Sequence, residues 1–397
     1  MLRRRYGRTE LQIPVFSTGG MRYQQSWKER IPSQLDQESQ KNLENTIYSG
    51  LELGFNHIET AQGYGTSEYQ LGLALKDVPR ESYILQSKIF SEPDLTQKEF
   101  REKIEESLEL LQTDYLDLFA FHGLNTPEHI DCVIRKGGLM EVAREYQKNG
   151  QLRHLGFSTH GSPQTINMAI DSGEFDYVNL WWFYTDQSRT PCLKAAKKQD
   201  MGVFIISPTN KGGMLNEAPE KLKEQCAPFS PIVFNDWFCL NQEEICTISV
   251  GASKPEDFEE HLKAIPYLKD QQDAELREVK AKLDQTQEQV LGKDFFHRGL
   301  HDIPDHNETP GNINIAVCAR LWLLAKAFDM TEFGTMRYNL LGNGGHWFPG
   351  LIIDDKLLPN VKRLLESHPY QEELMDILYE CNELFAGEEQ KRLSESD

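Results

Sequence analysis

Four ionisable side chains stand where consecutive strand-like runs of this sequence end. The first run ends at Glu59 and is followed five residues later by Tyr64, and the next two runs end in Lys88 and His122. In a barrel of parallel strands, the C-terminal ends of the strands meet on one face, where such proteins place their chemistry. We therefore expect these four side chains to lie together.

The four residue types suit reversible reduction of a carbonyl. A carbonyl that accepts hydride needs a proton, and a free tyrosine, with a pKa of about 10, is a weak acid near neutral pH. A buried ammonium lowers the pKa of a neighbouring phenol, so Lys88 would make Tyr64 a better proton donor. Glu59 would hold Lys88 by an ion pair, and His122 would orient the carbonyl. Taken singly, each residue has an ordinary explanation in packing or surface pairing.

The elements that must position these residues alternate between strand and helix from residue 14 to about 265. Strands are expected at 14–18, 56–60, 82–87, 115–121, 152–157, 177–181, 203–206 and 245–250. Helices are expected at 41–53, with Gly54 as C-cap, at 67–75, with a serine cap at Ser67, and at 97–111, 139–147, 163–170, 192–198, 231–240 and 255–264. Eight such units predict an α/β fold, a (β/α)8 TIM barrel. A doubly wound sheet is disfavoured because Gly-x-Gly-x-x-Gly after the first strand is absent.

The alternation stops near residue 270. We therefore expect two domains, a barrel over 1–270 and a mostly helical C-terminal extension over 271–397. Helices of the extension are expected at 273–291, 317–328, near 355–366 and at 370–385, before a polar, frayed end at 387–397.

Charge and composition limit the partners. The 397 residues include 42 Lys and Arg against 62 Asp and Glu, a net charge of −20, which argues against nucleic acid and anionic membrane as partners. An apolar run of transmembrane length is absent, and no signal peptide is recognisable at the start. Seven dispersed cysteines without a C-x-x-C pair suit a reducing compartment, so a cytoplasmic protein is expected.

A series of short motifs runs through the barrel region in a fixed order: Asn56–Ala61 with Tyr64-Gly65 and Glu68, Ser87-Lys88, Phe121-His122, Gly156–Ser158, Ile206–Pro208 and Gly251–Glu256. With these motifs, about two thirds of the chain resembles the aldo-keto reductase family. The resemblance implies a TIM barrel, a nicotinamide cofactor lying across its C-terminal face, and a catalytic tetrad formed by Glu59, Tyr64, Lys88 and His122.

The resemblance also implies positions that bind the cofactor. These are Gly20, Met21, Arg22, Ser158, Thr159, Asn179, Ser207, Pro208, Gly213, Leu215, Gly251, Ser253, Lys254, Asp257, Glu260 and His261. NADP(H) is expected from the family, with Lys254 as the cation for the 2′-phosphate. NAD(H) stays open, because Asp257 would repel a phosphate or could simply complement a helix dipole.

Three residues depart from the family's usual pattern. Glu59 stands where aspartate is usual, which displaces the carboxylate by roughly one bond length, about 1.5 Å. Asn179 replaces glutamine and keeps an amide, whereas Ile206 replaces an aromatic residue and cannot stack on nicotinamide.

The tail resembles the C-terminal region of bacterial aldo-keto reductases that carry a ferredoxin-like segment. In many of these, a C-x-x-C-x-x-C-x-x-x-C-P run holds an iron–sulfur cluster. The corresponding stretch 296–306 contains no cysteine, so a degenerate region without a cluster is expected. A metal at His297, His301 and His306 is the weaker alternative, and no metal site is assigned.

These observations predict an NADP(H)-dependent oxidoreductase that reduces aldehydes, ketones or quinone-like carbonyls, with Tyr64 as proton donor. Candidate pocket walls are Tyr23, Trp27, Trp181 and Trp182. Two alternatives remain: a nicotinamide-binding sensor or partner-docking subunit with little turnover, and a reductase of a one-electron acceptor such as ferric iron. A small carbonyl compound is the expected partner, and the sequence leaves the oligomeric state open.

Overall fold

The structure is a computed structural model that describes residues 1–269, 273–300 and 303–395. It divides into two compact units. The first consists of Met1–Gly212 with Asn235–Asp270, and the second of Gly213–Phe234 with Gln271–Asp397. The sequence had not indicated that Gly213–Phe234 groups with the C-terminal part of the chain.

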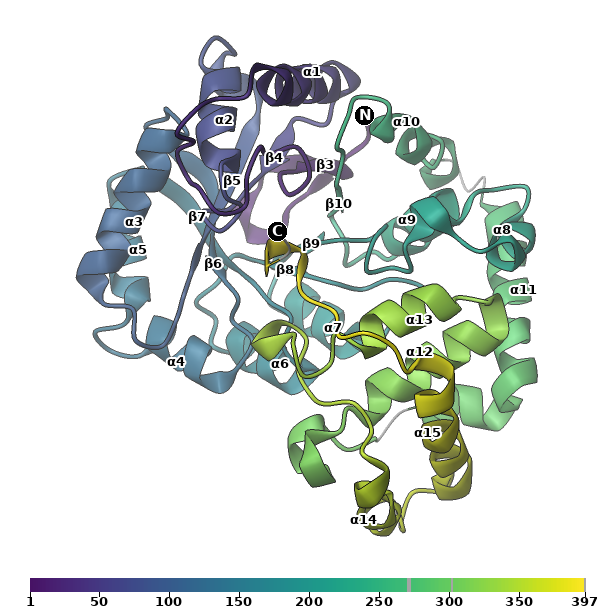
Figure 1. The fold of residues 1–397 in the computed structure, drawn as a ribbon. Coiled ribbons are helices and arrows are strands. Elements are labelled where there is room, and N and C mark those ends of the chain that lie inside the picture. Colours follow the sequence, from purple (N-terminus) through teal and green to yellow (C-terminus); the bar gives the residue numbers. More distant parts are fainter. Residues whose placement is uncertain (270–272, 301–302, 396–397) are drawn as a thin grey trace. The chain divides into compact units, whose positions relative to one another are not determined.

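The first unit is a closed barrel of parallel strands, in the order β10-β3-β4-β5-β6-β7-β8-β9, with β9 returning to β10 (Figure 1). Its strands are β3 (Phe16–Gly19), β4 (His57–Glu59), β5 (Ile84–Phe90), β6 (Leu116–His122), β7 (Leu152–Ser158), β8 (Tyr177–Leu180), β9 (Gly202–Ile205) and β10 (Thr247–Val250). The predicted TIM barrel is thereby confirmed.

Helices α1 to α7 lie outside the ring of strands (Figure 1). The helices with residues in the first unit are α1 (Gln37–Leu53), α2 (Ser67–Leu75), α3 (Gln97–Leu110), α4 (Pro127–Ile134), α5 (Leu139–Lys148), α6 (Pro163–Asp171), α7 (Thr190–Lys198), α9 (Pro231–Leu240) and α10 (Asp257–Leu262). Gly54 ends α1 in the left-handed conformation, as predicted, at φ 90°. The prediction that Ser67 caps α2 is wrong: Thr66 is the N-cap residue, and the Ser67 hydroxyl hydrogen-bonds that of Thr60 at 2.8 Å.

The barrel interior is filled by side chains of alternate strand residues. Leu118, Tyr177 and Phe204 form a buried cluster with Tyr6, which comes from the hairpin β1 (Arg3–Arg5) and β2 (Gln12–Pro14). Gly156 faces Tyr177 across β7 and β8, and a Cβ at Gly156 would lie only 2.6 Å from the tyrosine ring. The lower barrel is therefore a packed core, which leaves the C-terminal mouth for other roles.

The second unit is helical, as predicted. Its helices are α8 (Glu220–Cys226), α11 (Ala274–Leu291), α12 (Ile315–Phe328), α13 (Thr331–Tyr338), α14 (Leu358–Leu364) and α15 (Gln371–Phe385). The helix α12 packs against α11, α13 and α15 and buries Cys318 beside Cys381. All seven cysteines are buried free thiols. None of the described helices has the length and apolar character needed to span a bilayer.

Candidate active site

The strands point the predicted catalytic side chains toward the barrel mouth. Leu118 lies in the interior cluster, and Ile84 packs against it. Because side chains alternate along a strand, His122 on β6 and Lys88 on β5, four residues further along, point to the same side as these core residues. Tertiary structure thus brings together residues that the sequence separates by 34 positions.

Glu59 and Lys88 form a buried ion pair. The Lys88 Nζ contacts the Glu59 carboxylate directly and donates to the carbonyl of Thr60 at 2.8 Å. Burial lowers the pKa of the Lys88 ammonium well below its usual value, whereas the adjacent carboxylate favours the charged form. The glutamate therefore reaches its lysine despite the longer side chain.

The Tyr64 phenol sits on this pair. Its hydroxyl donates to Glu59 Oε1 at 3.4 Å, and Lys88 Nζ lies 4.6 Å from the centre of the tyrosine ring. Burial, with a smaller contribution from the Tyr23 phenol, raises the pKa of Tyr64 above its ordinary value. The expected lowering by the ammonium is outweighed, because burial disfavours phenolate and the cation lies over the ring face. Tyr64 is consequently a protonated acid at neutral pH.

His122 completes the cluster from the next strand. Its imidazole stacks on Phe90 at 4.6 Å, with an angle of 6° between the rings, and meets the Tyr64 ring edge-on at 5.8 Å. Stacking fixes the plane of the imidazole beside the phenol. All four predicted catalytic residues therefore share one site.

One wall of the site comes from the loop that follows β3. Trp27 meets the Tyr64 ring at 6.1 Å and 74°. Arg30 in the same loop pairs with the buried Glu68 at 2.6 Å, and Glu68 accepts a hydrogen bond from Ser87, the neighbour of Lys88. This anchored loop keeps Trp27 beside Tyr64, so Trp27 stays a candidate wall residue.

The other candidate wall residues differ in role. Trp182 stacks on Phe238 of α9 at 4.8 Å and donates to Thr190, so its side chain serves packing. Tyr23 is buried, and burial raises the pKa of its phenol. Trp181 is also buried and is surrounded by cationic side chains.

The rim continues from His122 through two further strands. His122 pairs in register with Ser158, and Ser158 pairs with Asn179. Asn179 is fully buried, and within the described part of the chain neither its amide nitrogen nor its amide oxygen has a hydrogen-bond partner. A buried amide without partners is costly, and a carboxamide ligand would supply both a donor and an acceptor. Asn179 therefore fits a nicotinamide carboxamide, whereas Thr159 donates to the Leu124 carbonyl at 2.7 Å.

Several cofactor residues predicted from the resemblance lie on neighbouring strand ends. Gly20 follows β3, and a Cβ there would lie 2.7 Å from the Glu59 carbonyl oxygen, so the backbone passes close to β4. The Arg22 side chain lies 3.4 Å from the position of a Cβ on Gly251, which follows β10. Of the remaining predicted residues, Met21 follows β3, and Ser207 and Pro208 lie after β9 in the first unit. Gly213 and Leu215 belong to the second unit.

Asp257 closes the loop that follows β10. One of its carboxylate oxygens accepts hydrogen bonds from the Ser253 backbone and hydroxyl, both at 2.8 Å, and from the Lys254 backbone at 3.3 Å. These are the donors that an anionic ligand of this loop would use. The carboxylate occupies them in the structure.

The other two predicted residues of this region have carboxylate or lysine partners. His261 is buried and pairs with the buried Asp236 at 2.5 Å. Glu260 pairs with Lys263 at 2.5 Å. The first interaction links α10 to α9, and the second lies at the end of α10 itself, so the structure gives each residue a partner without a ligand.

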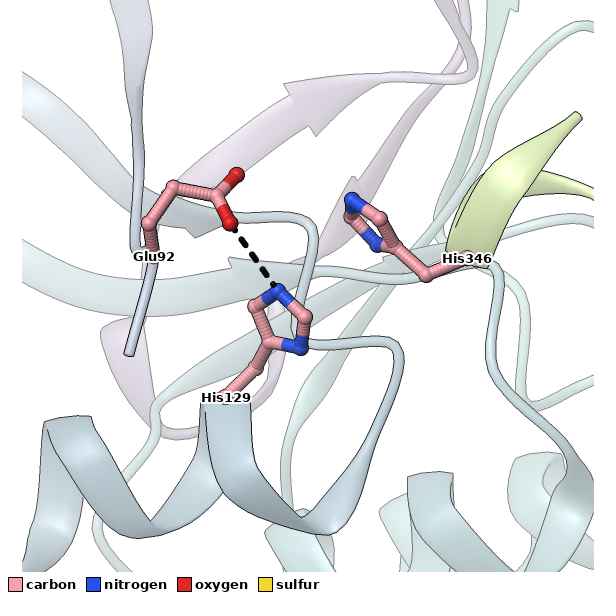
Figure 2. A group of neighbouring side chains, drawn as sticks. All are labelled: Glu92, His129 and His346. Atoms are coloured by element: carbon pink, nitrogen blue, oxygen red, sulfur yellow. Dashed lines mark ion pairs between the residues drawn. The ribbon is translucent and has the colours of Figure 1, made fainter. Parts of the chain in front are cut away.

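Several histidines outside the Tyr64 site have carboxylate partners. Glu92 forms an ion pair with His129 (Figure 2), in which the carboxylate oxygen lies 3.4 Å from Nε2. The other ring nitrogen of His129 lies 2.8 Å from the Thr126 hydroxyl. In the second unit, His297 pairs with Glu288 at 2.8 Å and His306 with Asp305 at 2.9 Å. His301 lies outside the described residues.

Sequence analysis missed two cationic residues and a histidine around Trp181. His160, Arg189 and Lys211 lie in loops after β7, β8 and β9 and all contact the Trp181 ring region. Their positions just beyond strand ends were the available signal.

An open hollow of about 690 Å³ lies near Tyr115 and Gln151. These residues precede β6 and β7, so the hollow is at the opposite ends of the strands from the Tyr64 site.

Comparisons with known proteins agree with this geometry. A model of the Aldo/keto reductase family matches residues 16–231, more than half of the chain. The chain is 24% identical over 271 residues to the NADH-specific methylglyoxal reductase of Escherichia coli K12, covering 56% of this chain and 82% of that protein. It is 25% identical over 254 residues to L-galactose dehydrogenase of Arabidopsis thaliana, covering 56% and 77%.

A solved structure shares the fold. An aldo-keto reductase from Klebsiella pneumoniae in complex with NADPH superposes with a TM-score of 0.55 at 17% identity. The match covers 70% of this chain and 96% of that protein.

Proposed function

The chain belongs to the aldo/keto reductase family, and on that premise we propose that it reduces small aldehydes, ketones or quinone-like carbonyls with a nicotinamide dinucleotide as hydride donor. The observation that carries the proposal is the stack of Tyr64 on the buried Glu59–Lys88 pair, with His122 at its edge. Each member has a separate task in carbonyl reduction, and all four lie at one barrel mouth.

The reduced nicotinamide, when bound, supplies the hydride. Tyr64 delivers the proton of its hydroxyl to the carbonyl oxygen, and its buried, protonated state suits an acid. Lys88 places positive charge near the phenolate that remains, held there by Glu59. His122 orients the carbonyl oxygen toward Tyr64, and Asn179 with Ser158 orients the carboxamide of the cofactor.

The residues around Ser253 bear on the choice between NADP(H) and NAD(H) as cofactor. Resemblance to the family favours NADP(H), with Lys254 as a cation for the 2′-phosphate. The contact of Asp257 with the Ser253 and Lys254 donors favours NAD(H), because a carboxylate in that place repels phosphate. Parallel fluorescence titrations with NADPH and NADH separate the two.

Replacement Tyr64→Phe tests the proposed chemistry. The variant keeps the ring that Lys88 and His122 contact, so we expect cofactor affinity to be retained and turnover to fall by about 10²–10⁴-fold. Unchanged turnover would remove Tyr64 as proton donor. Tight cofactor binding without turnover of any carbonyl by the wild type would support the sensor alternative instead.

A further inference from the structure

Two cations and an imidazole converge on the Trp181 indole at the barrel mouth. The Arg189 guanidinium carbon lies 4.2 Å and Lys211 Nζ 5.2 Å from the ring centre. The His160 imidazole meets the indole edge-on at 4.8 Å, and Lys211 Nζ is 3.3 Å from His160 Nδ1. These four side chains, from three consecutive loops of the rim, are called the Trp181 cluster below.

The Trp181 cluster is held by its own hydrogen bonds. Arg189 donates to the carbonyl of Gly161 at 2.9 Å and to that of His160 at 3.3 Å. The His160 backbone donates to the Asn125 side chain at 2.6 Å. One carboxylate, Asp186, lies 3.8 Å from Arg189. Such a preorganised set of cationic donors needs little reordering when it meets an anionic group.

The Trp181 cluster lies at the same end of the barrel as the proposed catalytic residues. Tyr177, Asn179 and Trp181 alternate along and just beyond β8, and Tyr177 points into the barrel core. The alternation therefore directs Asn179 and Trp181 to the interior side of the mouth. Asn179 stands two strands from His122, and two strand spacings amount to about 10 Å. Trp181 lies two residues beyond Asn179, so about 12 Å of backbone separates it from His122, and the inward-pointing side chains together with a ligand of a few carbon atoms span this distance.

A buried donor adds a second, independent indication of a ligand. Trp181 is 5% exposed, yet its indole Nε1 has no hydrogen-bond partner among the described residues. Buried N–H groups without acceptors are uncommon and call for a partner. Donors beside cations make up the kind of site that binds carboxylate or phosphate oxygens.

We propose that the Trp181 cluster binds the anionic group of a carbonyl substrate, so that the preferred substrates are aldehydes or ketones that carry a carboxylate or phosphate a few carbons from the carbonyl. This inference rests on the reductase function proposed above, for which it names the substrate class. Lys211 supplies the cation to be tested, because a lysine ammonium carries three donors that can turn toward an anion, while Arg189 is tied to backbone carbonyls.

The test compares two aldehydes of equal chain length, 4-oxobutanoate and butanal. We expect the wild type to prefer 4-oxobutanoate, and Lys211→Met to reduce the ratio of the two kcat/KM values by about tenfold or more, as expected for one charge-assisted hydrogen bond. Lys211→Arg should restore most of the ratio. Lys198→Met, at an exposed position on α7, is the matched control and should leave the ratio unchanged.

Cofactor titrations separate the substrate from the cofactor's own diphosphate. The Kd values of NADPH and NADH should change less than twofold in Lys211→Met. A loss of cofactor affinity equal to the loss of activity, or an unchanged ratio of the two aldehydes, would overturn the proposal.

A calorimetric titration with butanedioate covers the case in which the wild type reduces neither aldehyde and the proposed function itself fails. Binding that Lys211→Met weakens tenfold would still support an anion site. Absence of binding by the wild type would overturn it.

Discussion

Lys88 contacts the carboxylate of Glu59 inside the barrel, and the two side chains are 1% and 4% exposed. A buried pair of this kind adds little stability compared with apolar residues, but the loss of one member leaves the other charge without compensation. In the proposed mechanism, the pair holds a cation in place beside the Tyr64 phenol.

The substitution Glu59→Gln should destabilise the barrel by about 3–5 kcal/mol, because Lys88 would remain buried beside a neutral amide. Urea denaturation of wild type and variant gives the difference in free energy of unfolding. Glu102→Gln, which removes an exposed pair with Lys98 on α3, is the control and should have little effect. Equal stability of the Glu59 variant and the wild type would contradict a charged buried lysine.

The pH profile of carbonyl reduction should report the proton on Tyr64. Burial raises the pKa of this phenol, so the proton is retained to higher pH than in a free tyrosine, and the acid form persists throughout the neutral range. We expect kcat for reduction to stay level from about pH 7 to 9 and to decline only above about pH 10. The test is to measure steady-state rates across this pH range, after confirming that the chemical step limits the rate. A decline centred near pH 7 would mean that another group donates the proton.

The substitution Asp257→Asn should strengthen NADPH binding by about tenfold and leave NADH binding within about twofold, since it removes a negative charge from the loop at Ser253 and Lys254. Fluorescence titrations with the two cofactors measure the change. The matched control is Glu260→Gln, which removes a charge that already pairs with Lys263. If both substitutions raise NADPH affinity equally, the effect is general electrostatics and not a property of Asp257.

The stability of the barrel should depend on pH through His57. Burial lowers the pKa of His57 to about 3, so between that value and the ordinary value of about 6.5 the unfolded chain binds a proton that the folded chain does not. Stability therefore rises with pH across this window and is lost as pH falls from about 6.5 toward 3, by about 4–5 kcal/mol in all. Urea denaturation at pH 7, 6, 5 and 4 measures the slope.

A Gln at position 57 keeps hydrogen-bonding capacity toward Ser17 and Gln86 without a titrating group. His57→Gln should therefore flatten the dependence between pH 6.5 and 4. A slope as steep as that of the wild type would assign the effect to other groups.

Features that depend on neighbouring residues in the chain could be predicted well. Gly54 follows the last turn of α1, and only its own left-handed backbone is needed to end the helix there. The repeated alternation of strand and helix predicted the barrel, because each strand and its helix carry their pattern locally. The Ser67 hydroxyl illustrates the limit, since its partner, Thr60, lies in the preceding strand exit and competes with the cap position.

The four proposed catalytic residues could be selected from the sequence because Glu59, Lys88 and His122 stand near strand ends and Tyr64 follows one of them, but their electrostatics could not be predicted. From the sequence we expected Lys88 to lower the pKa of Tyr64. The structure places the ammonium over the ring and buries the phenol, which raises that pKa. Burial depends on many side chains that are far apart in the sequence, so a local sequence pattern does not reveal it.

The sequence by itself determined the residue types and their spacing along the chain, and with them the barrel, the helical extension and the positions of Glu59, Tyr64, Lys88 and His122 at successive strand ends. Only the tertiary structure decided which groups meet. It placed Lys88 on the longer Glu59 side chain, turned Asp257 onto the Ser253 loop, and gathered His160, Arg189 and Lys211 around Trp181. The physical reason is that strand register and barrel closure set distances between residues far apart in the chain, while charge and burial act through those distances.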